Sequence, residues 1–186
     1  TARKHPNACA ILFEGRDISW RDFNAMANRY AHYLSDRGIK RGDAVSVFME
    51  NRIEYMAMLV AMNKLGVIGG LLNTNLTGRS LAHCIKVAKS VACIVGEERI
   101  TEFAEVKEET DITDERLFFM PDNSQGACPE WATDIATESE ECSEDNHAEC
   151  VNSSLGETAF YIYTSGTTGL PKAAVMSNNR YLTAAT

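Results

Sequence analysis

Apolar positions along the first 120 residues follow two alternating patterns. Short apolar runs predict buried strands, and they lie at 8–13, 44–49, 67–72, 91–95 and 117–120. Between these runs, apolar residues recur every three or four positions, which predicts helices within 19–38, 51–66, 77–88 and 99–109. Strands that alternate with helices in this way predict an α/β fold with three layers around a mainly parallel sheet.

Local signals support the boundaries of these elements. Ser19 with Asp22 three residues later is typical of a helix N-cap, and Asn51 with Glu54 forms a similar pair. The glycines at 69–70, inside the third apolar run, suit a strand that another backbone approaches closely.

Neither pattern continues through residues 121–152. Turn-forming residues and a cluster of Glu and Asp predict a solvated acidic loop there, with an acidic protein-binding patch as the alternative. Cys142, His147 and Cys150 are close enough in sequence to suggest zinc, but the P-C-x-x-C pair that accompanies H-x-E in zinc deaminases is missing. We therefore expect no metal site.

Residues 161–172 have the composition of a phosphate-binding loop. An apolar, β-favouring segment leads into four hydroxyl side chains, two glycines and a lysine. Glycine lets backbone N–H groups approach an anion, hydroxyl groups donate hydrogen bonds, and the Lys172 ammonium follows a charged phosphate. The candidate nucleotide- and phosphate-binding residues are Tyr163, Thr164, Ser165, Gly166, Thr167, Thr168, Gly169, Leu170, Pro171 and Lys172.

This loop does not have the Walker A spacing. Counted from Gly166, that motif would need glycine where Pro171 stands and Ser or Thr where Ala173 stands. A surface turn rich in Ser, Thr and Gly is the alternative interpretation, although a plain turn does not require this combination of residues. Ligands of parallel α/β sheets bind at the carboxyl ends of strands, and the loop follows the end of a predicted strand.

Composition and charge narrow the function classes. The chain has 186 residues, of which 45% are hydrophobic and 24% charged, as in ordinary globular proteins, and no apolar run reaches the ~18 residues of a membrane span. The net charge is −8, and residues 117–171 contain ten acidic residues but no Lys or Arg, which disfavours a nucleic-acid partner. Six cysteines without a C-x-x-C pair are typical of reduced thiols in a cytosolic setting. No signal peptide is visible, and a start at Thr1 without methionine leads us to expect a piece of a longer protein.

Three segments resemble a known family. Residues 163–172, YTSGTTGLPK, resemble the AMP-binding signature of the adenylate-forming superfamily, which includes acyl-CoA synthetases, adenylation domains of peptide synthetases and luciferases. Residues 72–76 (LNTNL) and 81–84 (LAHC) are similar to one subgroup, the fatty acid transport proteins or very-long-chain acyl-CoA synthetases. The sequence departs from the family at Asn178 and Asn179, where members often carry a histidine.

The resemblance implies that residues 1–186 are part of the N-terminal AMP-binding domain of an adenylate-forming enzyme. The adenine- and ribose-binding segments, the C-terminal domain and its catalytic lysine would then lie beyond Thr186, so we assign no catalytic residue in this chain and expect it to be inactive alone. The implied ligands are ATP, Mg²⁺, coenzyme A and a fatty acid, whose carboxylate attacks the α-phosphate before the CoA thiol displaces AMP. Residues 164–169 would surround the β- and γ-phosphates, and Lys172 would neutralise the leaving pyrophosphate.

The resemblance leaves the exact activity and location open. The expected function is activation of long-chain or very-long-chain fatty acids, coupled to their uptake. The alternatives are a fatty acid transporter or binding protein without catalysis, and a short- or medium-chain acyl-CoA synthetase. The resemblance also implies membrane association of the longer protein, at the plasma membrane or endoplasmic reticulum, through parts outside this chain, with the cytoplasm as the alternative.

Overall fold

A computed structural model gives the structure of residues 1–122, 126–164 and 169–184. Its strands are β1 (Cys9–Phe13), β2 (Arg16–Ser19), β3 (Ala44–Phe48), β4 (Ile68–Leu71), β5 (Ser90–Gly96), β6 (Leu117–Met120), β7 (Thr133–Asp134), β8 (Thr158–Thr164) and β9 (Lys172–Ser177). Its α-helices are α1 (Trp20–Asp36), α2 (Ile53–Leu65), α3 (Gly78–Val87), α4 (Ile100–Ala104), α5 (Ile135–Glu138) and α6 (Asn178–Ala184). Single 3₁₀ segments are η1 (Glu97–Arg99), η2 (Lys107–Glu109), η3 (Asp114–Arg116) and η4 (Ala148–Asn152). The five apolar runs and four helices expected from the sequence correspond to β1, β3 to β6 and α1 to α4.

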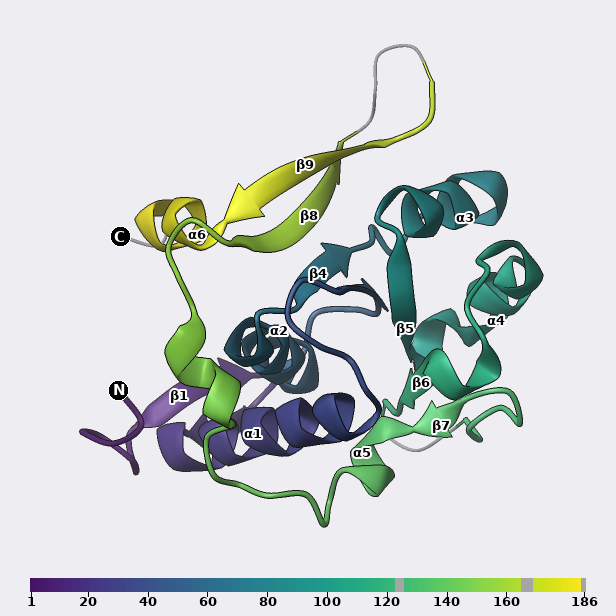
Figure 1. The fold of residues 1–186 in the computed structure, drawn as a ribbon. Helices are drawn as coiled ribbons and strands as arrows, with labels where there is room; N and C mark the ends of the chain where they lie inside the picture. The colour runs from purple at the N-terminus through teal and green to yellow at the C-terminus, as the bar shows by residue number, and fades with distance from the viewer. Residues whose placement is uncertain (123–125, 165–168, 185–186) are drawn as a thin grey trace.

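One sheet organises the chain (Figure 1). Its strand order is β7-β6-β5-β3-β4-β8-β9, and every neighbouring pair is parallel except β8 and β9. β1 and β2 form a separate antiparallel hairpin that leads into α1. The predicted α/β fold with a mainly parallel sheet is confirmed.

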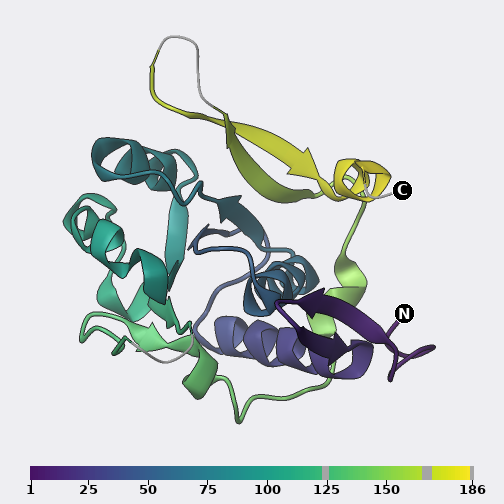
Figure 2. The same ribbon diagram turned by 180° about the vertical axis from the view of Figure 1, so that it is seen from behind.

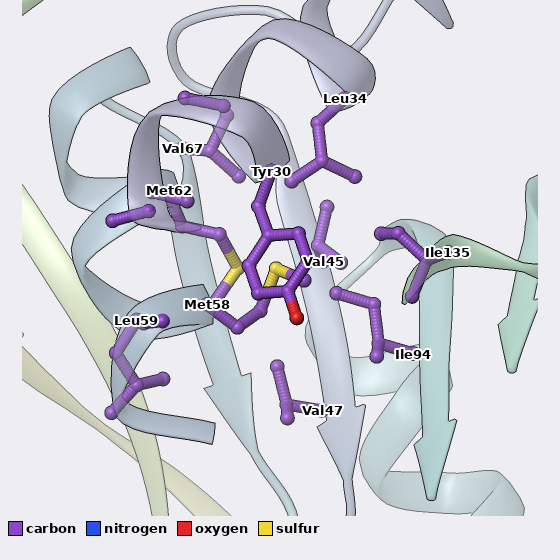
Figure 3. Close-up of a cluster of buried hydrophobic side chains, with 14 of the residues drawn as sticks. Tyr30, Leu34, Val45, Val47, Met58, Leu59, Met62, Val67, Ile94 and Ile135 are labelled. Carbon is purple, nitrogen blue, oxygen red and sulfur yellow. The ribbon is translucent and has the colours of Figure 1, made fainter. Parts of the chain in front are cut away.

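Side chains that alternate between the two faces of the sheet build two cores. Val45 and Val47 of β3 pack with α1 and α2 in the first core, whereas Phe48 packs with α3 and α4 in the second. Figure 3 shows the first core, where apolar side chains from α1, α2, β3, β5 and α5 meet. Helices on both faces give the three predicted layers (Figure 2).

The ends of α1 and α2 combine predicted and unpredicted features. The Ser19 hydroxyl accepts a hydrogen bond from the Asp22 backbone N–H at 3.1 Å, so the predicted N-cap is confirmed. Gly66 ends α2 in the left-handed conformation, with φ of 71°, which favours glycine. The expected N-cap at Asn51 is wrong: α2 begins after Arg52, which is anchored by its guanidinium to Glu98 at 3.0 Å.

Residues 121–152 differ in part from the predicted solvated loop. β7 pairs with β6, Ile135 is fully buried in the first core, and Trp131 lies 5.7 Å from Phe103 between ring centroids. Further along, Glu144 forms an ion pair with Arg29 of α1 at 2.6 Å. The apolar residues of this segment are too sparse for a periodic signal, yet they hold its backbone against the domain. Its acidic side chains at 138, 140, 141, 144 and 145 are exposed.

Candidate functional site

The candidate loop links two antiparallel strands at one edge of the sheet (Figure 1). β8 runs parallel to β4 and ends at Thr164, and β9 returns from Lys172 along β8. The loop therefore leaves the carboxyl end of a strand, as the sequence predicted. Parallel α/β sheets bind their ligands at the carboxyl ends of their strands. The return strand β9 was not predicted, because its residues show no clear alternation of apolar and polar side chains.

The structure describes six of the ten candidate residues: Tyr163, Thr164, Gly169, Leu170, Pro171 and Lys172. Ser165, Gly166, Thr167 and Thr168 lie outside the described residues. Thr164 and Lys172 are exposed and stand directly opposite each other in the ladder, so their side chains share one face of the hairpin. A hydroxyl and an ammonium on one face are suited to an anionic ligand.

Helix α3 contacts both strands at the base of the loop. The Tyr163 hydroxyl donates a hydrogen bond to the Cys84 carbonyl oxygen at 2.9 Å. The His83 Nε2–H donates to the Pro171 carbonyl oxygen at 3.2 Å, because a carbonyl can only accept. Burial raises the pKa of Tyr163, so its hydroxyl stays protonated and remains a donor.

Gly70 makes room for the Tyr163 side chain. A Cβ atom at Gly70 would lie 3.3 Å from the Tyr163 hydroxyl oxygen and 3.4 Å from the Ser46 hydroxyl oxygen. The glycine pair was expected to allow the close approach of another backbone. The atoms that an added Cβ at Gly69 or Gly70 would meet are instead mostly side-chain atoms, with the Ser46 Cα slightly farther from Gly70 at 3.6 Å.

Charged and polar residues after β3, β4 and β5 brace the carboxyl ends of these strands. Arg99 and Thr74 both hydrogen-bond the Glu50 carboxylate, and these bonds, that of Arg99 first, lower its pKa. Glu98 accepts from the Glu50 backbone N–H at 2.6 Å and from Arg52 at 3.0 Å. This network was not predicted from the sequence, although each member closely follows a predicted strand, and that position was the available signal.

His147, one of the three residues considered for zinc, has a local backbone partner. His147 accepts a hydrogen bond at Nδ1 from the Glu149 backbone N–H at 3.2 Å. Within residues 1–122, 126–164 and 169–184, no group of three or more His, Cys, Asp or Glu side chains is placed to hold a metal ion.

Asn178, the first of the two asparagines at which the sequence departs from the resemblance, lies at the other end of β9 from the loop. Its side-chain amide donates to the Ser154 carbonyl at 2.8 Å and accepts from Asn63 of α2 at 2.6 Å. Six residue steps separate it from Lys172, which corresponds to roughly 20 Å along β9 and its end. The side-chain amide of Asn178 therefore ties the end of β9 to α2 and to Ser154, and neither of these two partners belongs to the candidate loop.

Comparison with known families places these features in context. The family model described as AMP-binding enzyme matches residues 1–186. The chain belongs to the AMP-binding enzyme family. Long-chain fatty acid transport protein 6 of Mus musculus is 34% identical over 97% of this chain and 29% of its own length. The medium/long-chain-fatty-acid–CoA ligase FadD6 of Mycobacterium tuberculosis is 32% identical over 98% of this chain and 29% of its own length.

These relatives confirm the resemblance carried by the signature, but this AMP-binding chain spans less than a third of their length. A solved anthranilate CoA ligase, AuaEII, in complex with anthranoyl-AMP has the same fold with a TM-score of 0.87, at 20% identity over 98% of this chain and 34% of that one. The N-terminal domain of FACL13 from Mycobacterium tuberculosis gives a TM-score of 0.78, at 24% identity over 95% of this chain and 42% of that one. Among helices in the described ranges, none has both the length and the apolar character that a bilayer crossing requires.

Proposed function

We propose that this chain is the N-terminal part of the nucleotide-binding domain of a longer fatty acid–CoA ligase. The observation that carries the proposal is the position of the signature: residues 163–172 join β8 to β9 at the carboxyl edge of the sheet, with Thr164 and Lys172 exposed on one face. The names of the relatives support a fatty acid as the acid substrate and CoA as the acceptor.

The proposed reaction has two steps. A fatty acid carboxylate attacks the α-phosphate of ATP, forming acyl-adenylate and releasing pyrophosphate, and the CoA thiol then displaces AMP to give the thioester. Attack brings an anionic nucleophile to an anionic phosphate, so fixed donors around the phosphate chain lower the barrier. Within this chain, the Lys172 ammonium balances charge on the departing pyrophosphate and the Thr164 hydroxyl donates to a phosphate oxygen.

Magnesium commonly accompanies ATP, but the described residues do not by themselves supply a magnesium site. Thr164 supplies an exposed hydroxyl oxygen at the base of the loop, and no group of three or more His, Cys, Asp or Glu side chains in the part of the chain that the structure describes is placed to hold a metal ion. The ion would be held mainly by the phosphates of ATP, as in many ATP sites. We derive no step through it.

Replacement of Lys172 tests the proposal. In the longer protein that carries this chain, Lys172→Ala should slow ATP–pyrophosphate exchange by about a hundredfold, because a charge that stabilises the leaving group is removed. Lys40→Ala is the matched control, since Lys40 is also exposed but lies before β3, at the amino ends of the parallel strands. Exchange that is as fast in Lys172→Ala as in Lys40→Ala would reject the proposal.

A carrier that transports fatty acids without catalysis is the second candidate, favoured by the names of the transport proteins among the relatives. The same variant separates the two ideas. Fatty acid uptake that survives Lys172→Ala while ligase activity is lost would support a carrier. Uptake that falls in parallel with ligase activity would support trapping of the acid as its CoA ester. Membrane association of the longer protein belongs with this proposal, and cell fractionation would test it.

A further inference from the structure

We propose that helix α3 is the support that positions the two described ends of the phosphate-binding loop, and with them Lys172, with Tyr163 and His83 as the two positioning residues. This inference rests on the proposed function, because it assumes that the loop acts on the phosphates of ATP. It assigns a role in catalysis to a helix that precedes the signature by some eighty residues.

The two contacts lie on consecutive residues of one helix. The Tyr163 hydroxyl, at the end of β8, donates to the carbonyl of Cys84 at 2.9 Å. His83 Nε2, on the preceding residue of α3, donates to the carbonyl of Pro171 at 3.2 Å, directly before β9. One turn of α3 therefore holds the chain where it enters the loop and where it leaves it. Figures 1 and 2 show α3 beside the loop end of the β8–β9 hairpin from both sides.

The hairpin needs this support because it lies at the edge of the sheet. β9 has β8 as its one strand neighbour in the described ranges, and the Val175 side chain on β9 is 56% exposed. Little packing therefore fixes where β9 begins. The bond from His83 to Pro171 fixes the backbone of the residue before Lys172, and so sets where the ammonium is presented.

The residue types suit this role. Proline has no backbone N–H, so Pro171 offers only its carbonyl, and its fixed φ restricts how the chain enters β9. The Tyr163 ring packs against the second core, while its hydroxyl reaches past Gly70 to α3. The ring thus contributes to folding and the hydroxyl to the position of the loop, and a Tyr163→Phe substitution separates the two contributions.

Hydrogen exchange tests the structural half of the inference. In the longer protein without nucleotide, Tyr163→Phe and His83→Leu should each speed amide exchange in peptides that cover 162–174 by about fivefold to tenfold, the effect of losing one hydrogen bond. His83→Gln keeps a side-chain N–H donor and should restore slow exchange. Tyr55→Phe on α2 is the matched control, since it removes a tyrosine hydroxyl from the opposite helical layer. If amide exchange at 162–174 were as slow in Tyr163→Phe and His83→Leu as in Tyr55→Phe, the proposal would be overturned.

Kinetics test the catalytic half. ATP–pyrophosphate exchange should show kcat reduced about tenfold in Tyr163→Phe and His83→Leu, with KM for ATP changed less, because Lys172 acts most strongly as pyrophosphate departs. His83→Gln should recover kcat, which a loss of general stability would not explain. Faster amide exchange with unchanged kcat would overturn the positioning role. If Lys172→Ala also kept full ATP–pyrophosphate exchange activity, the proposed function itself would be wrong. The amide hydrogen-exchange result would still decide whether α3 supports the ends of the loop.

Discussion

Replacement of Tyr33 by phenylalanine is expected to stabilise the chain. Tyr33 of α1 is only 3% exposed, and its hydroxyl oxygen has no hydrogen-bond partner within the described ranges. The ring is well held, since it meets Phe118 edge-on with centroids 5.7 Å apart and lies 4.7 Å from Arg37 Cζ. Phenylalanine would keep both ring contacts and remove only the buried hydroxyl.

The size of the effect follows from the burial of this hydroxyl. A buried polar group without a partner costs about 1–3 kcal/mol, and we expect a gain of about 1 kcal/mol near neutral pH, or roughly 2–4 °C in Tm for a chain of this length. Burial also raises the pKa of Tyr33 to about 12, whereas tyrosine in an unfolded chain titrates near ~10. Between these values the unfolded state releases the proton first, so the Tyr33 hydroxyl lowers the stability of the original chain as pH rises, a contribution that the variant lacks. The difference in free energy of unfolding should therefore widen by about 1.4 kcal/mol per pH unit above ~10.

Urea unfolding of both chains near neutral pH and at about pH 11, followed by circular dichroism, would measure the two effects. Tyr181→Phe is a suitable control, because the Tyr181 side chain is 44% exposed and its loss of a hydroxyl should change little. A less stable Tyr33→Phe variant near neutral pH would refute the reasoning. So would a stability difference that stays the same at both pH values.

Two further substitutions probe the scaffold beneath the loop. Gly70→Ala would place a Cβ atom 3.3 Å from the Tyr163 hydroxyl oxygen, and we expect a loss of about 1–2 kcal/mol in unfolding free energy with faster amide exchange after Tyr163. Gly156→Ala, where no atom lies within 4 Å of the added Cβ, should show neither effect, and equal results for the two variants would contradict the expectation. Arg52→Ala removes a buried guanidinium from Glu98 and from the Met120 carbonyl and should cost about 3 kcal/mol in urea unfolding. Arg21→Ala is the control, because it breaks only the exposed pair with Asp22 and should change the free energy of unfolding little. If Arg52→Ala lowered the free energy of unfolding no more than Arg21→Ala does, Arg52 would not be anchored as described.

The sequence predicts most of the fold because its elements are long enough to repeat a pattern. β3 and β5 are buried on both faces and appear as continuous apolar runs, and α1 repeats its apolar stripe over several turns. β7 has two residues and α5 has four, too few for any period, so residues 121–152 looked like a loop. The position of the signature at the carboxyl edge was also predictable, since it follows directly from a parallel sheet.

The contacts that hold the candidate site could not be predicted in the same way. His83 belongs to the LAHC segment that resembles a subgroup of the family, but its bond to Pro171 spans 88 positions and needs the three-dimensional fold. Arg52 was not foreseen as the start of α2, because its partners Glu98 and Met120 lie far along the chain. A pattern read from neighbouring residues cannot reveal partners that only the folded sheet brings together.

The place of β8 in the sheet has a consequence for how the protein is made. β8 is inserted beside β4, and Tyr163 bonds to a residue 79 positions earlier, so the hairpin joins a surface formed entirely by chain that is synthesised before it. Pairing over such a long separation is slow because a large loop must close first. During translation, β3, β4, β5 and α3 emerge from the ribosome ahead of the signature, so β8 and β9 join strands that are already outside it.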